Sequence, residues 1–279
     1  MKQFERLLHS IDRKYRKFTD ARFNKLQPQD TPLGFKLMGN EAMEQGLFEP
    51  EETFLVRKLL DKAEHFVNVG ANIGYYCCLA LQKNIPVIAF EPESQNVKFL
   101  LKNIQANNWD DQIEIYPVAL SDSIGIVDIY GGGTGASLLK GWAGTPSNLA
   151  ASIPTSTLDL IVGDRLNNLR TLVVIDIEGA EFYALKGALR IIQQSPKPIW
   201  MIEICVHEHQ PQGVPINPNL LSTFSVFWDN GYDAYTASMN PRLVTREELE
   251  AIVNSGADTI NTYNFIFVEN GYDLLSGVL

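Results

Sequence analysis

The sequence predicts an α/β protein in which helices cover both faces of a mostly parallel sheet. From residue 51 onward, short apolar segments alternate with longer amphipathic segments, which is the pattern of successive βαβ units. In addition, 45% of the 279 residues are hydrophobic and 20% are charged, as in a globular chain that buries a core. The apolar segments are nearly continuous, as expected for parallel strands that are buried on both sides.

The expected elements follow one another in a regular order. The strands are expected at residues 65–69, 86–90, 113–116, 172–177, 199–204, 232–236 and 263–268. The helices are expected at residues 51–62, 75–82, 95–108, 180–193 and 246–254. Residues 124–157 interrupt the alternation because they are polar and rich in glycine and proline, which predicts a long loop. Within it we expect a lid-like insertion over about 131–157, in which Trp142 either stacks on a sugar or anchors the loop.

The N-terminal part differs in charge from the rest of the chain. Residues 1–25 contain eight Lys or Arg and three Asp or Glu, and Phe4, Leu8 and Ile11 recur at helical spacing. This predicts a basic amphipathic helix that packs on the domain or on a second copy in a homodimer. Contact with an anionic membrane surface or substrate is the alternative. With a linker over 27–35, we divide the chain into an extension (1–45) and a catalytic domain (46–279).

Charge and composition exclude several classes of protein. The net charge of −10 argues against nucleic acid as a partner. Three cysteines cannot build a disulfide framework, which indicates a reducing compartment. The chain contains no secretory signal and no apolar run near the roughly 20 residues that span a bilayer. We therefore expect a cytoplasmic protein without an integral membrane segment.

A glycine-containing turn after the first strand carries the main functional information. Residues 67–74 read VNVGANIG, so an apolar strand runs through Gly70 and Gly74 into a helix. The glycines allow a tight turn and the close approach of a ligand to the backbone. At the end of the second strand comes Glu91, which is placed to accept hydrogen bonds from both hydroxyls of a ribose. Together these features predict a nucleoside-containing cofactor.

The spacing of the glycines distinguishes between two such cofactors. Dinucleotide-binding turns read G-x-G-x-x-G, whereas this turn reads G-x-x-x-G and has Asn72 at the middle position. A side chain there crowds a pyrophosphate but tolerates S-adenosylmethionine, which has none. An NAD-dependent oxidoreductase fits Glu91 but not this spacing, and it remains the alternative from another enzyme class.

These residues resemble the FkbM-type S-adenosylmethionine-dependent methyltransferases over roughly residues 48–206. The matching segments are VNVGANIG at 67–74, FEP at 90–92, ALSD at 119–122, TLD at 157–159, IDIEGAE at 175–181, LKGA at 185–188 and MIEI at 201–204. The resemblance implies a Rossmann-like class I methyltransferase sheet whose last strand is antiparallel. It also implies S-adenosylmethionine as cofactor and O-methylation of a hydroxyl on a sugar, polyketide or related small molecule.

The resemblance further assigns residues to parts of the cofactor. Gly70, Asn72 and Gly74 would approach the methionine part and Glu91 the ribose. Ala119 and Leu120 would flank the adenine. Where the family usually has Asp, this chain has Asn68. The asparagine side chain keeps an acceptor oxygen but lacks the negative charge. Because Asn68 lacks this charge, a non-catalytic binding protein of the same fold remains a further alternative.

Three residues are candidates for the transfer step itself. Asp176 ends the fourth parallel strand at the cleft edge of the sheet, where it either orients and deprotonates the acceptor or caps the next helix. Glu203 and His207 lie at and beyond the end of the fifth strand, and histidine is suited to act as a base near neutral pH. A metal is not expected, because the His-x-His pair formed with His209 has no clear third ligand.

Overall fold

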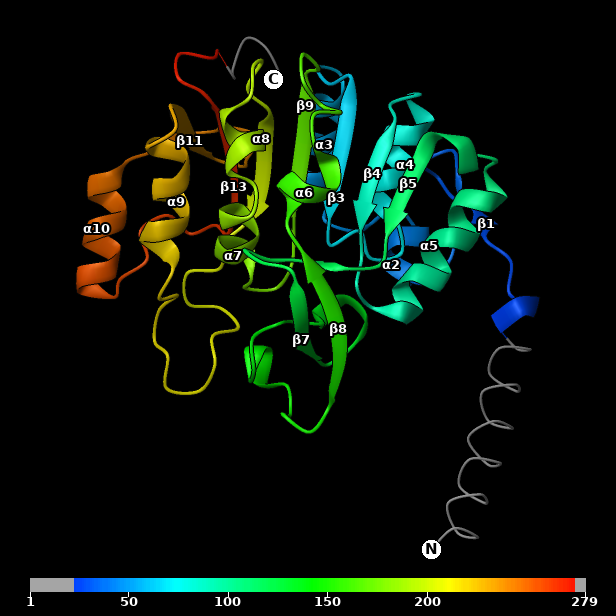
Figure 1. The fold of residues 1–279 in the computed structure, drawn as a ribbon, viewed down its shortest axis with the longest axis horizontal. Coiled ribbons are helices and arrows are strands. Elements are labelled where there is room, and N and C mark those ends of the chain that lie inside the picture. Colours follow the sequence, from blue (N-terminus) through cyan, green and yellow to red (C-terminus); the bar gives the residue numbers. More distant parts are fainter. Residues whose placement is uncertain (1–22, 274–279) are drawn as a thin grey trace, which may run out of the picture.

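The structure, a computed structural model, describes residues 23–273. They form a central eight-stranded sheet with helices on both faces (Figure 1). Its strands are β3 (His65–Val69), β4 (Val87–Phe90), β5 (Ile113–Tyr116), β9 (Thr171–Ile175), β10 (Ile199–Glu203), β11 (Tyr232–Thr236), β12 (Leu243–Val244) and β13 (Asn264–Glu269). Of the basic helix predicted over 1–25, all but residues 23–25 lie outside the described residues, and these three are helical.

The strands are ordered β12-β11-β13-β10-β9-β3-β4-β5. Strands β5, β4, β3, β9 and β10 are parallel to their neighbours in this series, and β13 pairs antiparallel with both β10 and β11. This confirms the mostly parallel sheet with an antiparallel last strand. The chain leaves β3 toward β4 and later returns beside β3 as β9, so the strand order reverses between these two. In such sheets, ligands bind at the carboxyl ends of the strands at this reversal.

Two layers of helices cover the sheet because successive strand residues point to opposite faces. In β3, Val67 and Val69 pack in one core with α6 (Leu158–Val162), α7 (Glu181–Lys186), α8 (Leu189–Gln193), α9 (Leu220–Trp228) and α10 (Arg246–Ser255). Phe66 packs in the other core with α3 (Pro50–Leu60), α4 (Tyr75–Gln82) and α5 (Ser94–Ala106). None of the described helices has the length and hydropathy needed to cross a membrane.

The segment predicted as a loop over 124–157 contains two strands. β7 (Gly125–Tyr130) and β8 (Ala150–Ser156) are antiparallel, and with β6 (Ala119–Leu120) they form a second sheet in the order β6-β8-β7. The pair projects beyond the carboxyl ends of the parallel strands (Figure 1). For β8 the prediction was wrong because this strand carries a proline, Pro154, and small residues, which are weak strand formers. For β7, which reads GIVDIY, it was wrong because the strand signal of the Ile, Val and Tyr residues was passed over in favour of the glycines and prolines that follow. Residues 131–149, called the connecting loop below, join β7 to β8.

The helix predicted over 180–193 is divided into α7 and α8 at Gly187. A Cβ atom at Gly187 would lie 2.2 Å from the backbone oxygen of Ser121, so the chain here packs backbone against backbone. The carbonyl of Gly187 also accepts a hydrogen bond from the amide of Asp159, over 2.9 Å. Contacts with residues that are distant in the sequence thus end α7 at Gly187, although the helical periodicity of the sequence continues beyond it.

Part of the segment predicted as a linker packs on the domain. Strands β1 (Gln29–Asp30) and β2 (Lys36–Leu37) form a small antiparallel pair, and α2 (Glu41–Glu44) follows. Within the predicted linker, Phe35 is buried in the core formed with α3, α4 and α5. Just after it, Leu37 is fully buried, and the amide of Met38 donates to Oδ1 of Asn103 on α5 over 2.9 Å.

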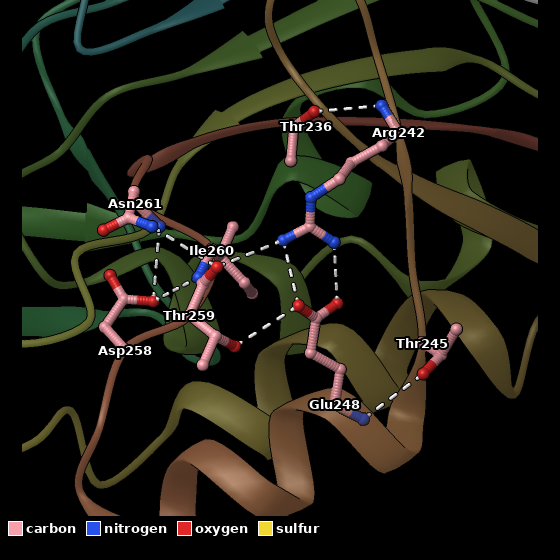
Figure 2. Close-up of polar contacts among 8 residues, drawn as sticks. All are labelled: Thr236, Arg242, Thr245, Glu248, Asp258, Thr259, Ile260 and Asn261. Atoms are coloured by element: carbon pink, nitrogen blue, oxygen red, sulfur yellow. Dashed lines mark hydrogen bonds and ion pairs between the residues drawn. The ribbon is translucent and has the colours of Figure 1, made fainter.

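At the far edge of the sheet, one arginine joins three segments (Figure 2). The guanidinium of Arg242 binds both carboxylate oxygens of Glu248 on α10, each over 2.9 Å, and donates to the carbonyl of Thr259 over 3.5 Å. Its backbone amide donates to the hydroxyl of Thr236 on β11, and Thr245 caps α10. This bidentate pair lowers the pKa of Glu248 and fixes the C-terminal helix to the sheet.

Candidate active site

The turn after β3 brings the ends of two parallel strands together. Gly70 has a φ of 82°, and a Cβ atom there would lie 1.8 Å from the backbone oxygen of Asp176. The amide of Asp176 donates to the carbonyl of Val69 over 3.0 Å, so the end of β9 lies against the end of β3. Gly74 has a different neighbour, because a Cβ atom at this position would lie 2.3 Å from Leu100 of α5. Both predicted glycines are thus required by the fold.

A pocket of about 600 Å³, including its open mouth, lies at this junction. Six of the predicted site residues line it, namely Gly70, Asn72, Glu91, Ala119, Leu120 and Asp176. The connecting loop supplies a further wall with Gly133, Thr134, Ala136 and Leu138. We call this the cofactor pocket. The predicted residues Asn68, Gly74, Glu203 and His207 are not among those that line it.

Glu91 is held in this pocket by three hydrogen bonds. Oε2 accepts from the amide of Asn72 over 2.7 Å, and Oε1 accepts from the amide of Glu93 over 2.8 Å and from Nδ2 of Asn96 over 3.3 Å. The side chain is only 4% exposed. Burial raises the pKa of Glu91 to about 7, although the two backbone amides favour the charged form.

A second, smaller pocket adjoins the first at Asp176. It has a volume of about 250 Å³, and we call it the acidic pocket. Its polar lining consists of Glu49, Glu52, Tyr76, Asp176, Glu203 and Asn264. The hydroxyl of Tyr76 donates to Oε2 of Glu49 over 2.8 Å, and Nδ2 of Asn264 donates to Oε1 of Glu52 over 3.2 Å. The structure thus brings Asp176 and Glu203 together, as two of the three catalytic candidates.

Burial and mutual repulsion hold protons on these carboxylates. Burial, and then the charges of Glu203 and Glu178, raise the pKa of Asp176 well above its usual value. Burial, and then the charges of Glu178 and Glu181, raise the pKa of Glu203 to about 8. Carboxylates that interact this strongly titrate as a group, so their protons are lost in steps that belong to the cluster.

His207 lies outside both pockets. Its Nδ1 is 2.7 Å from the carbonyl oxygen of Pro215, so this nitrogen carries the hydrogen and donates. The ring is only partly buried, in the loop that follows β10. Among residues 23–273, no group of three or more His, Cys, Asp or Glu side chains is arranged to hold a metal ion.

Asn68 is buried within β3 on the face that packs against α3 and α4. It is 2% exposed, and its Oδ1 has no hydrogen-bond partner among the described residues. Its register neighbour on β9 is Val174, which lines the acidic pocket. Asn68 therefore lies closer to the acidic pocket than to the cofactor pocket, where it was predicted to contact the cofactor.

Comparison with known proteins decides the family. A family model described as "Methyltransferase FkbM domain" matches residues 68–234, which is more than half of the chain. The chain belongs to the FkbM methyltransferase family. S-adenosylmethionine is the methyl donor of this family and the cofactor of this chain. The family is therefore not one of NAD-dependent oxidoreductases.

Two solved structures are similar to this FkbM-family chain. One is methyltransferase FkbM from Methylobacillus flagellatus, with 20% identity, a TM-score of 0.44 and coverage of 74% of this chain and 44% of that chain. The other is an O-methyltransferase from Bacillus cereus in complex with SAH, with 12% identity, a TM-score of 0.43 and coverage of 78% and 79%. The chain thus spans less than half the length of the first protein. A comparison with curated proteins gave no match.

The residues of the cofactor pocket fit this cofactor. A carboxylate has about four acceptor positions, and Glu91 uses three of them within the protein, so one remains for a ribose hydroxyl. The contact with Asn96 is the longest of the three, and its displacement would free a position for the second hydroxyl. Ala119 and Leu120 are both buried and apolar, as a wall against adenine would be.

The structure also brings to the site contacts that the sequence did not predict, including one made by Trp142, the residue expected to stack on a sugar or to anchor the loop. Asn96 joins Glu91 to the connecting loop, because its Nδ2 also donates to the carbonyl of Gly133 over 3.1 Å. Trp142 donates to the carboxylate of Glu178 over 2.6 Å. Glu49 and Tyr76 line the acidic pocket. Of Asn96, Glu49 and Tyr76, only Glu49 had a local signal, since it precedes the proline that begins α3.

Proposed function

We propose that this FkbM-family methyltransferase transfers its methyl group to a hydroxyl of a sugar, polyketide or related small molecule. In this proposal the acceptor hydroxyl lies where the cofactor pocket and the acidic pocket meet, and Asp176 orients and deprotonates it. The supporting observation is that Asp176 lines both the cofactor pocket and the acidic pocket. A side chain at that junction is within reach of an acceptor oxygen placed beside the methyl donor.

The chemistry assigns each residue one task. The bound cofactor supplies an electrophilic methyl group on a sulfonium. The carboxylate of Asp176 takes the hydroxyl proton as the acceptor oxygen bonds to the methyl carbon and the carbon–sulfur bond breaks, leaving its electron pair on sulfur. Gly70 and Glu91 would hold the donor beside Asp176, and in-line alignment of the reacting atoms can supply much of the rate.

The electrostatics of the cluster suit a base. An aliphatic hydroxyl is a poor nucleophile while it keeps its proton, and a base is most effective when its pKa lies near the working pH. Burial, and then the charges of Glu203 and Glu178, raise the pKa of Asp176 well above its usual value. The transfer rate should therefore rise with pH, since protonated Asp176 cannot accept a proton. His207 keeps a secondary place in the proposal, because its ring is bound to Pro215.

The experiment begins with a screen for transfer of labelled methyl from the cofactor to hydroxyl-bearing acceptors. With an acceptor in hand, Asp176→Asn should lower kcat by about 10²–10⁴-fold, because it keeps the shape of the side chain and removes the base. Glu208→Gln is a matched control, since Glu208 is exposed and lines neither pocket. His207→Ala should lower kcat less than Asp176→Asn does.

Other results would contradict the proposal in distinct ways. Asp176→Asn at the wild-type rate would leave this residue without a role in transfer. A wild-type enzyme that methylates amines and no hydroxyl would place the acceptor in another class. A chain that binds S-adenosylhomocysteine but transfers no methyl group to any acceptor would be a non-catalytic relative.

A further inference from the structure

The turn that follows β9 adopts a backbone conformation that needs outside support. Glu178 has a φ of 56°, in the left-handed region, and Gly179 follows with a φ of 96°. For a residue with a side chain, this region costs on the order of 1–2 kcal/mol. Asp176 lies two residues before Glu178, so whatever holds the turn also holds the proposed base.

The connecting loop provides that support through two hydrogen bonds to Glu178. The hydroxyl of Ser137 donates to the backbone oxygen of Glu178 over 2.6 Å. The indole Nε1 of Trp142 donates to Oε2 of Glu178, also over 2.6 Å. A bond from a neutral donor to a carboxylate is roughly twice as strong as a bond between neutral groups.

Trp142 is also packed directly on the turn. It is 1% exposed, and a Cβ atom at Gly179 would lie 2.6 Å from its Cζ3 atom, so the ring rests against the glycine backbone. On its other side, the ring lies 6.0 Å from that of His209, and the amide of Ala143 donates to the carbonyl of His209 over 2.7 Å. These contacts hold the indole in the position from which its Nε1 donates to Glu178.

The same loop reaches the opposite end of the cofactor pocket. Its Gly133 carbonyl accepts from Asn96, which also binds Glu91. Trp142 does not line the pocket, whereas Gly133 and Thr134 do. The loop thus has one end at the ribose anchor and the other at the turn that carries Asp176. A change at Trp142 should affect the second end and leave the first intact.

We propose that Trp142 is a positioning residue for methyl transfer, which acts by holding the Glu178 carboxylate and with it the turn from Asp176 to Gly179. This inference rests on the proposed function only for the role of Asp176. Trp142 has a purely structural alternative, in which its ring fills a buried space and the hydrogen bond to Glu178 is incidental.

Hydrogen exchange tests the positioning without any substrate. In the cofactor-free protein, amides of residues 177–181 should exchange about tenfold or more faster in Trp142→Phe and in Glu178→Ala, because each variant removes one partner of the bond. Trp200→Phe is the matched control, since Trp200 is a buried tryptophan whose indole donates to Tyr232 away from both pockets. Unchanged exchange of this turn in both site variants would overturn the proposal.

Kinetics of the double variant separate positioning from packing. Trp142→Phe and Glu178→Ala should each lower kcat by roughly 10–100-fold, and the double variant should lie within about threefold of either, because both break one coupling. Glu178→Gln keeps an acceptor oxygen for the indole, so the amides of residues 177–181 should keep their wild-type exchange, whereas the loss of the charge changes the pKa of Asp176 and with it kcat. In Trp142→Phe the KM for the cofactor should change by less than about threefold, because Trp142 does not line the cofactor pocket, whereas Glu178 does. Effects that multiply in the double variant would support the structural alternative and overturn ours.

The two proposals fail in different ways. Absence of transfer to any hydroxyl by the wild-type protein would contradict the proposed function, and the exchange experiment would still decide whether Trp142 holds the turn. Should Trp142→Phe not fold, Glu178→Ala and Ser137→Ala carry the same test, since each removes one bond to the turn and neither removes a fully buried ring.

Discussion

Binding of the cofactor should depend on pH through Glu91. In the free protein, burial raises the pKa of Glu91 to about 7. If Glu91 binds the ribose as predicted, a hydroxyl donates to the charged carboxylate, so binding favours the deprotonated form and affinity should rise with pH through this value. The group of like charge nearest to it in the sequence is Glu93, whose repulsion also favours the protonated form of free Glu91.

The size of the effect follows from the fraction of Glu91 that is ionised. If only the ionised form binds, the apparent Kd is multiplied by a factor of about 1.1 at pH 8, about 2 at pH 7 and about 11 at pH 6. The Kd should therefore rise about tenfold between pH 8 and pH 6, which corresponds to about 1.4 kcal/mol. Calorimetry with S-adenosylhomocysteine measures this directly, and the absence of a sulfonium charge simplifies its reading.

Glu91→Gln separates this carboxylate from the other acids near the pocket. Its single amide oxygen cannot accept from both Asn72 and Glu93, so one backbone amide loses its partner at a cost of about 1–3 kcal/mol. The variant should bind more weakly and lose the pH dependence. Glu93→Gln keeps the oxygen that caps α5, and this variant should retain the pH dependence of cofactor binding. A Kd that is flat from pH 6 to 8 in wild type, or an unchanged slope in Glu91→Gln, would refute the reasoning.

Two further predictions concern stability and Asn68. Without cofactor, the free energy of unfolding should fall by on the order of a few kcal/mol as pH rises from about 5 to about 8, because Glu91 and Glu181, each with a pKa of about 7 in the fold, keep protons that the unfolded chain has lost near pH 4.5. Urea midpoints at both ends of that range measure this, and a midpoint that rises with pH contradicts it. Because Asn68 does not line the cofactor pocket, Asn68→Asp should change the Kd of S-adenosylhomocysteine by less than about threefold. Tightening of tenfold or more by calorimetry, the size of a charged hydrogen bond, would make position 68 a cofactor contact.

The sheet and half of the site were predictable because they depend on local sequence. Buried parallel strands are read from short apolar runs, and their carboxyl ends meet at one edge by geometry alone. Gly70, Glu91 and Asp176 each follow directly on such a run, so their convergence in one pocket could be expected. The sequence predicted a tight turn at Gly70, but only the structure shows that this glycine is needed because β3 ends against Asp176.

The remaining contacts depend on where the chain turns between strands. Glu178 meets Trp142, which lies 36 residues earlier in the sequence, and no periodicity predicts this pairing. His207 was a reasonable base by its chemistry, but the chain leaves the strand direction after Glu203 and binds the imidazole to Pro215. Glu203 lines the acidic pocket because it is the last residue of β10 and points to the same face of the sheet as Met201.

The carboxylates around Asp176 explain how one pocket can serve both binding and proton transfer. The charges that shift the pKa of Asp176 belong to Glu203, Glu178, Glu49 and Glu91, all of the same sign. Such a cluster cannot be fully ionised near neutral pH, so the resting site holds protons. The positive sulfonium of a bound S-adenosylmethionine would favour ionised carboxylates in this cluster and so promote loss of the proton that Asp176 holds. Cofactor binding should therefore shift Asp176 toward the ionised form that accepts the proton of the hydroxyl, which links the two pockets through charge as well as through a shared residue.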